Sequence, residues 1–235
     1  MRSRMRRGVA AAFTVSALCL TAACGGSSDK GADSGKAEDT GKEAPAAAAP
    51  LTAAQMKAGL LEVKDLPAGW KTEPAGSSDQ VAKTDKPECR PLAVLMTDKI
   101  AGATLGGNQE FGDKNSSILA HQVFTFQDSK GAEDFVTGIG TAVAACAKGE
   151  MTMEGNKVPI TAQKVAAPQV GEGTEALRLT MEMAPGIKIE ADILVVRQGA
   201  GVARVAYVPS PPSTHKDFDA LAKLAGDKFV KGAQS

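Results

Sequence analysis

The chain of 235 residues carries 27 basic and 27 acidic side chains, and only 4% of its residues are aromatic. Seven of the basic residues lie before residue 51, so residues 51–235 hold 20 basic against 22 acidic side chains. A domain this close to neutral does not attract a phosphate backbone, and we expect no nucleic-acid partner. Its length is enough for one domain with a real core of Val, Ile, Leu, Ala and Phe.

The first 24 residues have the pattern of an export signal that ends in a cysteine. Four arginines fall within the first seven residues, an uncharged run covers 8–23, and the sequence Leu-Thr-Ala-Ala directly precedes Cys24. A basic start, a short apolar run and small residues before the cut are typical of secretory signals. With a cysteine at the cut, the pattern predicts a bacterial lipoprotein signal over 1–23 and a lipid-modified Cys24. The alternative is an ordinary secretory signal cut after Ala23.

Residues 24–50 follow as a predicted tether. They are rich in Gly, Ser, Ala, Asp, Lys, Glu and Pro, and they contain almost no large apolar residue. Such a composition buries too little apolar surface to offset the entropy of ordering. A flexible coil of this length spans on the order of 30 Å. We therefore expect the tether to hold a domain at 51–235 off the outer face of the cell membrane.

The first half of this domain predicts helices around one clear strand. Thr52 and Gln55 have the spacing of a capping box, followed by apolar residues at helical spacing. A short helix is expected over 91–97 and a long one from Ser129 to about Ala147, with an extended piece over 70–74 and a loop over 75–88. Residues 118–127 alternate as a strand.

The second half predicts strands over 157–166, 174–183, 187–197 and 201–208, joined by short turns. Strands joined in this way are antiparallel. A last helix is expected to begin at Thr214 or His215. The predicted fold class is therefore α+β, an antiparallel sheet with helices packed on it.

Cys89 and Cys146 are the two cysteines of the domain beyond Cys24. An oxidising compartment and an even count favour a disulfide between them over two reduced thiols. A zinc site needs four ligands, and His121 and His215 do not have ligand spacing to either cysteine. We expect neither a metal nor a cofactor.

The order of these elements resembles the PknH-like extracellular sensor domain over the whole of 51–235. The residues that carry the resemblance are Asp65-Leu66-Pro67-Ala68-Gly69-Trp70, Cys89, the strand 121–127, the helix that ends at Ala145-Cys146, Val170-Gly171-Glu172-Gly173, and the terminal hairpin and helix. That domain occurs outside an actinobacterial serine/threonine kinase and in free lipoproteins. The resemblance implies an antiparallel sheet flanked by helices, with a ligand cleft. The family usually has two disulfides, and this chain matches one pair.

Motifs for enzymatic chemistry are missing from the sequence. There is no Gly-x-Ser-x-Gly, Ser-x-x-Lys, His-Glu-x-x-His or P-loop pattern. Residues 171–176 match Gly-x-Gly-x-x-Ala, but a strand pattern follows where a dinucleotide site needs a helix, so a turn is favoured. The methionines at 151, 153, 181 and 183 predict either core or a soft binding surface.

The predicted ligand site is the strand face with His121, Val123 and Thr125, because it is neither fully apolar nor fully charged. Helices are expected on the opposite face, with Phe124 and Phe126. The predicted function is a lipid-anchored extracytoplasmic domain that senses or binds a small cell-envelope ligand. The alternative is an adaptor that contacts a membrane receptor or transporter. A cleft of several hundred Å³ favours the first and an exposed apolar patch favours the second.

Overall fold

Strands from both halves of the chain form one antiparallel sheet. The structure, a computed structural model, describes residues 48–76, 82–153 and 155–235. Within these residues the sheet has eight strands in the order β1-β2-β3-β8-β7-β6-β5-β4. The strands are β1 (Lys71–Glu73), β2 (Ala103–Gly112), β3 (Ile118–Phe126), β4 (Lys148–Met153), β5 (Asn156–Lys164), β6 (Gly173–Ala184), β7 (Ile187–Gln198) and β8 (Gly201–Val208). The predicted α+β class is confirmed.

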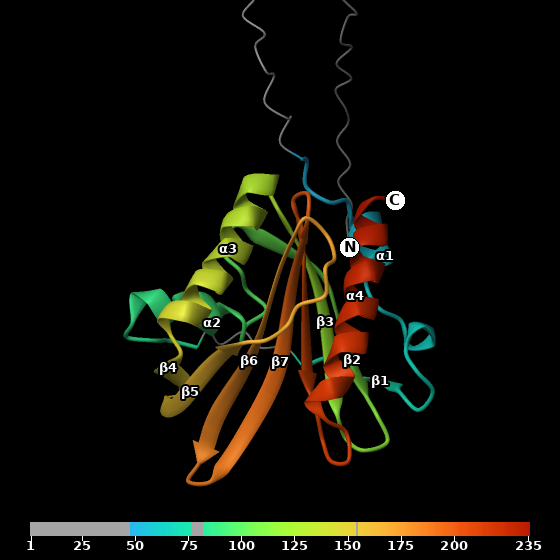
Figure 1. Ribbon diagram of the computed structural model, residues 1–235. Coiled ribbons are helices and arrows are strands. Elements are labelled where there is room, and N and C mark those ends of the chain that lie inside the picture. Colours follow the sequence, from blue (N-terminus) through green and yellow to red (C-terminus); the bar gives the residue numbers. More distant parts are fainter. Residues whose placement is uncertain (1–47, 77–81, 154) are drawn as a thin grey trace, which may run out of the picture. The chain divides into compact units, whose positions relative to one another are not determined.

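Helices cover both faces of this sheet (Figure 1). On one face lie η2 (Pro87–Cys89), α2 (Arg90–Val94) and α3 (Ser129–Ala145). On the other lie α1 (Ala53–Ala58), η1 (Val63–Asp65), η3 (His215–Asp217) and α4 (Phe218–Ala233). Two separate clusters of buried apolar side chains result, one beneath α2 and α3 and one beneath α1 and α4.

The helix starts follow local capping chemistry. Thr52 caps α1 in the predicted capping box with Gln55. Asp128, one residue before the predicted Ser129, caps α3, because its carboxylate accepts the Gly131 N–H at 2.8 Å. Thr214 caps η3, which leads directly into α4.

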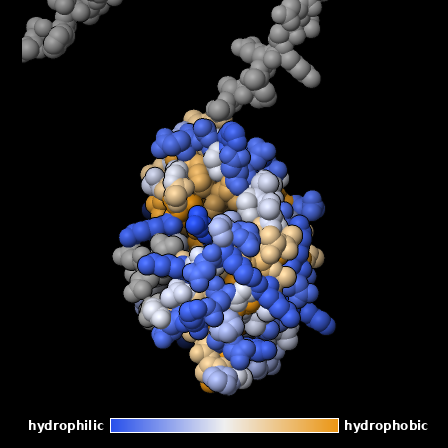
Figure 2. Space-filling view, turned by 90° about the vertical axis from the view of Figure 1, so that its left-hand side faces the viewer, coloured by the Kyte–Doolittle hydropathy of each residue, from blue (hydrophilic) through white to orange (hydrophobic). Residues whose placement is uncertain are grey.

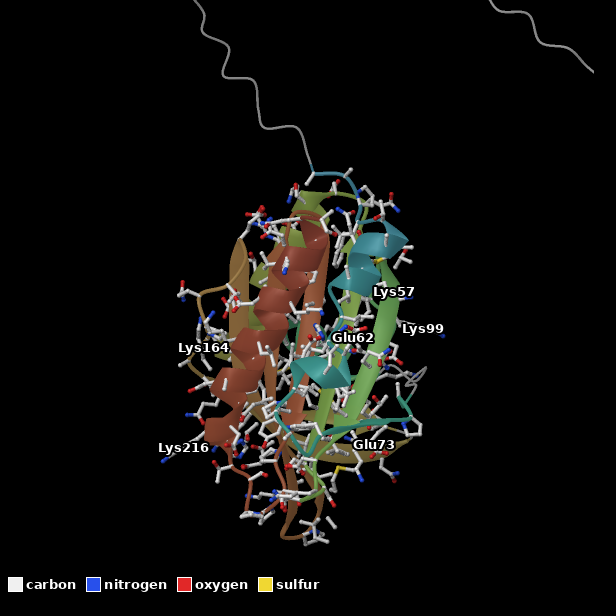
Figure 3. All side chains as sticks on the ribbon, turned by 90° about the vertical axis from the view of Figure 1, so that its right-hand side faces the viewer. Lys57, Glu62, Glu73, Lys99, Lys164 and Lys216 are labelled. Carbon is white, nitrogen blue, oxygen red and sulfur yellow. A yellow bond between two sulfur atoms is a disulfide. The ribbon has the colours of Figure 1, made fainter. Side chains whose placement is uncertain are left out.

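The ends of α1 and α4 meet closely, because a Cβ on Gly232 would overlap the backbone of Gly59. Below this contact, the Lys228 ammonium of α4 lies 3.0 Å from the Asp65 carboxylate of η1. Figure 3 shows α1, η1 and α4 side by side over the sheet, with Glu62 between α1 and η1. These elements therefore cover this face of the sheet.

Candidate functional site: a groove between two helices

A groove runs between α2 and α3 on one side of the molecule. It consists of two hollows of about 240 and 360 Å³ that share Pro91, Asp134 and Gly138 in their walls. The smaller hollow is also lined by Arg90, Val94, Ile100, Ala101 and Phe135. The larger is also lined by Pro87, Glu88, Thr137, Thr141, Ala142 and Ala145. Figure 2 faces this side and shows hydrophobic surface among hydrophilic side chains at the height of the two helices.

The two walls of this α2–α3 groove are joined covalently. Cys89, at the end of η2, forms a disulfide with Cys146, the C-cap of α3, and both residues are 1% exposed. The predicted disulfide is confirmed. Because the bond lies where η2 leads into α2, it fixes the distance between the walls at one end of the groove.

A buried network of polar side chains around Arg204 connects the sheet to α2. The guanidinium of Arg204 in β8 donates to the Gln122 side-chain oxygen, at 2.7 Å from Nε, and to the Val94 carbonyl at 3.1 Å. It also lies 3.7 Å from the Asp98 carboxylate and 5.5 Å from the centre of the Phe124 ring. Burial lowers the pKa of Arg204 to about 10. Since Val94 lines the groove, this network sets the position of its wall.

Gly138 joins the two hollows. It lies in the middle of α3, where glycine costs about 1 kcal/mol relative to alanine. A Cβ built on Gly138 would meet no atom within 4 Å. No close contact therefore requires a glycine here, and the space that a side chain would occupy is part of the groove.

The rim of the smaller hollow carries an unpaired cation. Arg90 is exposed and makes no hydrogen bond or ion pair with any residue that the structure describes. The neighbouring Asp134 binds Lys130 instead, with its two oxygens 2.7 and 2.6 Å from the ammonium. The lining of the groove is thus predominantly apolar, with Arg90 in the smaller hollow and the polar side chains of Glu88, Thr137 and Thr141 in the larger one.

The predicted ligand residues lie elsewhere, inside the opposite layer. His121, Val123 and Thr125 are 0%, 0% and 8% exposed. Phe124 and Phe126 pack under α2 and α3 as predicted, but the expectation that helices cover only that face is wrong. Leu119 and Val123 make the second face of β3 apolar as well, so α1 and α4 pack there. Ligand binding by these three residues stays a prediction that would require α1 or α4 to move.

The side chains of His121 and Thr125 make hydrogen bonds to backbone N–H groups that stabilise the fold. Nδ1 of His121 accepts the Leu61 N–H at 3.0 Å, and burial lowers the pKa of this imidazole to about 3. Nε2 of the same ring is buried and has no partner. The Thr125 hydroxyl accepts the Leu51 N–H at 2.7 Å and so binds the start of the described chain.

A second candidate surface is an apolar strip on the α2–α3 face of the sheet, at the end with the β6–β7 turn. We define it by four exposed side chains with Val208 between them. The four are Ile118, Met183, Ile187 and Ile189, at 41%, 48%, 61% and 38% exposure. Ile118 pairs with Val208 in the β3–β8 ladder, and Ile189 and Ile187 pair with Met181 and Ala184 in the β6–β7 ladder. Figure 2 shows hydrophobic surface at the lower end of the molecule, where Figure 1 has this turn. Of the four methionines considered above, Met151 and Met181 are core and Met183 is surface.

Titratable groups also gather around His215. Its Nδ1 lies 2.6 Å from the fully buried Asp192 and its Nε2 lies 3.0 Å from Glu190. Arg178 binds the same Asp192 at 2.7 Å. Both ring nitrogens are therefore engaged by carboxylates, which leaves neither for a nucleophile. Within the described ranges, no group of three or more His, Cys, Asp or Glu is placed to hold a metal ion.

Cys24, the predicted site of the lipid anchor, lies with the rest of the segment 1–47 outside the described residues. In the described part of the chain, no helix is long and apolar enough to cross a membrane.

Comparisons with known proteins bear on the fold. The extracellular domain of PknH from Mycobacterium tuberculosis superimposes with a TM-score of 0.56 at 16% identity, over 79% of this chain and 97% of that one. The chain has the fold of the PknH extracellular domain. An Rv0999 ortholog from Mycobacterium smegmatis matches at 10% identity with a TM-score of 0.47, over 79% and 98% of the two chains. No family model and no curated protein matches the sequence.

Sequence reasoning missed the groove and the residues that shape it. The PknH-like fold was predicted from the order of elements, but Arg90, Gly138 and Arg204 were not singled out. One signal for Gly138 was present, since a glycine in the middle of a strongly predicted helix opposes helix formation. No sequence signal pointed to Arg90, because whether this side chain has a partner depends on which residues the fold places beside it.

Proposed function

We propose that this chain is an extracytoplasmic binding module, anchored by lipid at Cys24, that holds a small apolar molecule of the cell envelope in the α2–α3 groove. The observation that carries the proposal is the groove itself. Its combined hollows reach the size range of small-ligand sites, and its lining is predominantly apolar.

Two further features support the extracytoplasmic part of the proposal. The disulfide is typical of proteins that fold in an oxidising compartment. The fold is shared with a domain described as extracellular. The described residues that line the groove include no convergent set of nucleophile, base and oxyanion donors, so the proposed role is binding or sensing rather than catalysis.

Native mass spectrometry of the protein purified from the organism that makes it tests this function. We expect a mass above that of the lipidated chain, which falls to the bare mass after extraction with organic solvent. In a paired NMR experiment, extraction should shift the amide signals of Gly138 and Val94 but not those around His215. A bare mass in every preparation, with no change in these signals, would contradict the proposal.

The apolar strip supports a second function, a protein-interaction adaptor. Exposed apolar patches on soluble domains often mark contact surfaces. Ile187→Asp introduces a charge at the most exposed of these side chains without entering a core. If the strip is a contact surface, this variant loses a crosslinked membrane partner that wild type retains. A partner retained equally by the variant and wild type would exclude the strip as its contact.

A further inference from the structure

The α2–α3 groove has the shape of an extended chain rather than of a compact ring. Its α3 wall runs from Asp134 to Ala145, and eleven residues of α helix rise about 16 Å. The two hollows lie along this length and meet beside Pro91 and Gly138. An unbranched chain can pass this junction and contact both walls along its whole length.

The charges along the groove give such a chain a direction. Arg90 lines the hollow that also contains Phe135 and Ile100, and its guanidinium has no partner in the described structure. Guanidinium groups bind carboxylates and phosphates through two parallel hydrogen bonds. Asp134, in the wall of both hollows, contacts Lys130 rather than Arg90 in the structure, with its oxygens 2.7 and 2.6 Å from the ammonium. The apolar part would then lie toward Ala142 and Ala145.

We infer that the α2–α3 groove binds an anionic amphiphile with one unbranched apolar chain, its head group on Arg90 and its chain past Gly138 toward Ala145. This inference rests on the proposed function and names the class of ligand. A neutral molecule would leave Arg90 unused, and a cationic one would be repelled by it. A carboxylate and a phosphate head share the chemistry that Arg90 recognises.

Calorimetric titration with three probes of equal chain length tests the inference. The probes are dodecanoate, dodecyl phosphate and dodecyltrimethylammonium, each below its micellar concentration. The protein is the full chain with Cys24→Ser, which carries no lipid and needs no detergent. We expect both anions to bind and the cation to bind at least about tenfold more weakly.

Two substitutions assign the contacts. Arg90→Gln should weaken both anions about tenfold and strengthen binding of the cation, because the charge that repels it is gone. Gly138→Leu should abolish binding of all probes, because the leucine fills the junction of the hollows. This substitution removes a glycine from a helix interior, so the thermal midpoint should hold or rise, which shows that the variant folds. Ala144→Leu, on an exposed position of α3 outside the groove, and Lys114→Gln, on the β2–β3 turn, are matched controls that should bind like wild type.

The outcomes separate the inference from the function on which it rests. Equal binding of the cation, or anion binding that Arg90→Gln does not change, overturns the anionic class. If Gly138→Leu still abolishes binding in that case, the groove remains the binding site. If no probe binds while protein from its own organism carries a ligand, the inference fails and the proposed function stands. Unchanged binding in Gly138→Leu overturns the inference and removes the groove from the proposed function.

Discussion

The Leu61 N–H donates a hydrogen bond to Nδ1 of His121 across 3.0 Å, and so ties the segment after α1 to the middle of the sheet. The geometry requires a neutral ring, since a protonated imidazole has no lone pair to accept this bond. Among the described residues no carboxylate pairs with this ring, and burial lowers the pKa of His121 from 6.5 to about 3.

This bond predicts loss of stability in mild acid. The folded-state pKa lies below the unfolded one, so the full contribution is present above pH 6.5 and declines as the pH falls toward 3. Each pH unit in that window costs about 1.4 kcal/mol, which gives a loss of roughly 2 kcal/mol between pH 7 and pH 5. Urea unfolding at a series of pH values measures it.

His121→Gln is the control for the acid effect. The variant has no imidazole at this position, so its stability should be nearly flat between pH 6.5 and 5 even if it is lower overall. The hydrogen bond with His215 lowers the pKa of Glu190. Protonation of this carboxylate therefore destabilises the fold only below about pH 4.5. An equal slope in wild type and variant above pH 5 would show that His121 is not the group responsible.

The Cys89–Cys146 disulfide should contribute about 4 kcal/mol to the free energy of unfolding, by the chain-entropy model for a bond of sequence separation 57. The double variant Cys89→Ser, Cys146→Ser should show this loss in urea unfolding. Wild type in a strong reductant should approach the same midpoint. Similar midpoints for the oxidised wild type and the double variant would mean that the bond adds no stability.

Loss of the Gln122 side chain should destabilise the fold through Arg204. Gln122→Leu removes an acceptor from a guanidinium that is 6% exposed, and we expect a cost of about 3 kcal/mol. The paired variant Gln122→Leu, Arg204→Met should recover part of this loss, because the buried charge is gone. A double-mutant cycle in urea measures the coupling. Strictly additive costs would show that the two side chains do not interact.

Lipid modification at Cys24 is tested by fractionation. Cys24→Ser should move the protein from the membrane fraction to the soluble exported fraction, because two acyl chains anchor a protein stably and the described residues include no helix that could cross a membrane. Ser27→Ala, in the predicted tether, is the matched control and should stay with the membrane. Membrane retention of Cys24→Ser would contradict the predicted anchor.

The strongly periodic elements could be predicted from the sequence. β5 alternates buried and exposed residues, β7 and β8 contain continuous buried runs, and α3 and α4 repeat apolar residues at helical spacing, because each buries at least one full face. β2 and β4 were missed. Both lie near the edges of the sheet, where β2 is mostly half-exposed and interrupted by Gly106 and Gly107. A weakly buried strand leaves little pattern to detect.

The candidate site was less accessible to sequence reasoning for a different reason. The alternation of residues along β3 correctly placed His121 and Phe124 on opposite faces of the sheet. It did not show that a second pair of helices would cover the His121 face. The α2–α3 groove depends on how a five-residue helix docks against α3, which the disulfide and the Arg204 contact to Val94 decide. Such long-range contacts have no local signature.

The place of β8 in the sheet has a consequence for how the chain acquires its structure. This last strand lies between β3 and β7, and so joins β1-β2-β3 to β7-β6-β5-β4. Because β8 is the last strand in the sequence, the segments that form both groups precede the strand that connects them. Until residues 201–208 emerge, β3 and β7 each expose an unpaired edge, a ready template for pairing with other chains. Completion of the sheet therefore waits for contacts of long sequence separation, which places this fold among the slower-folding topologies.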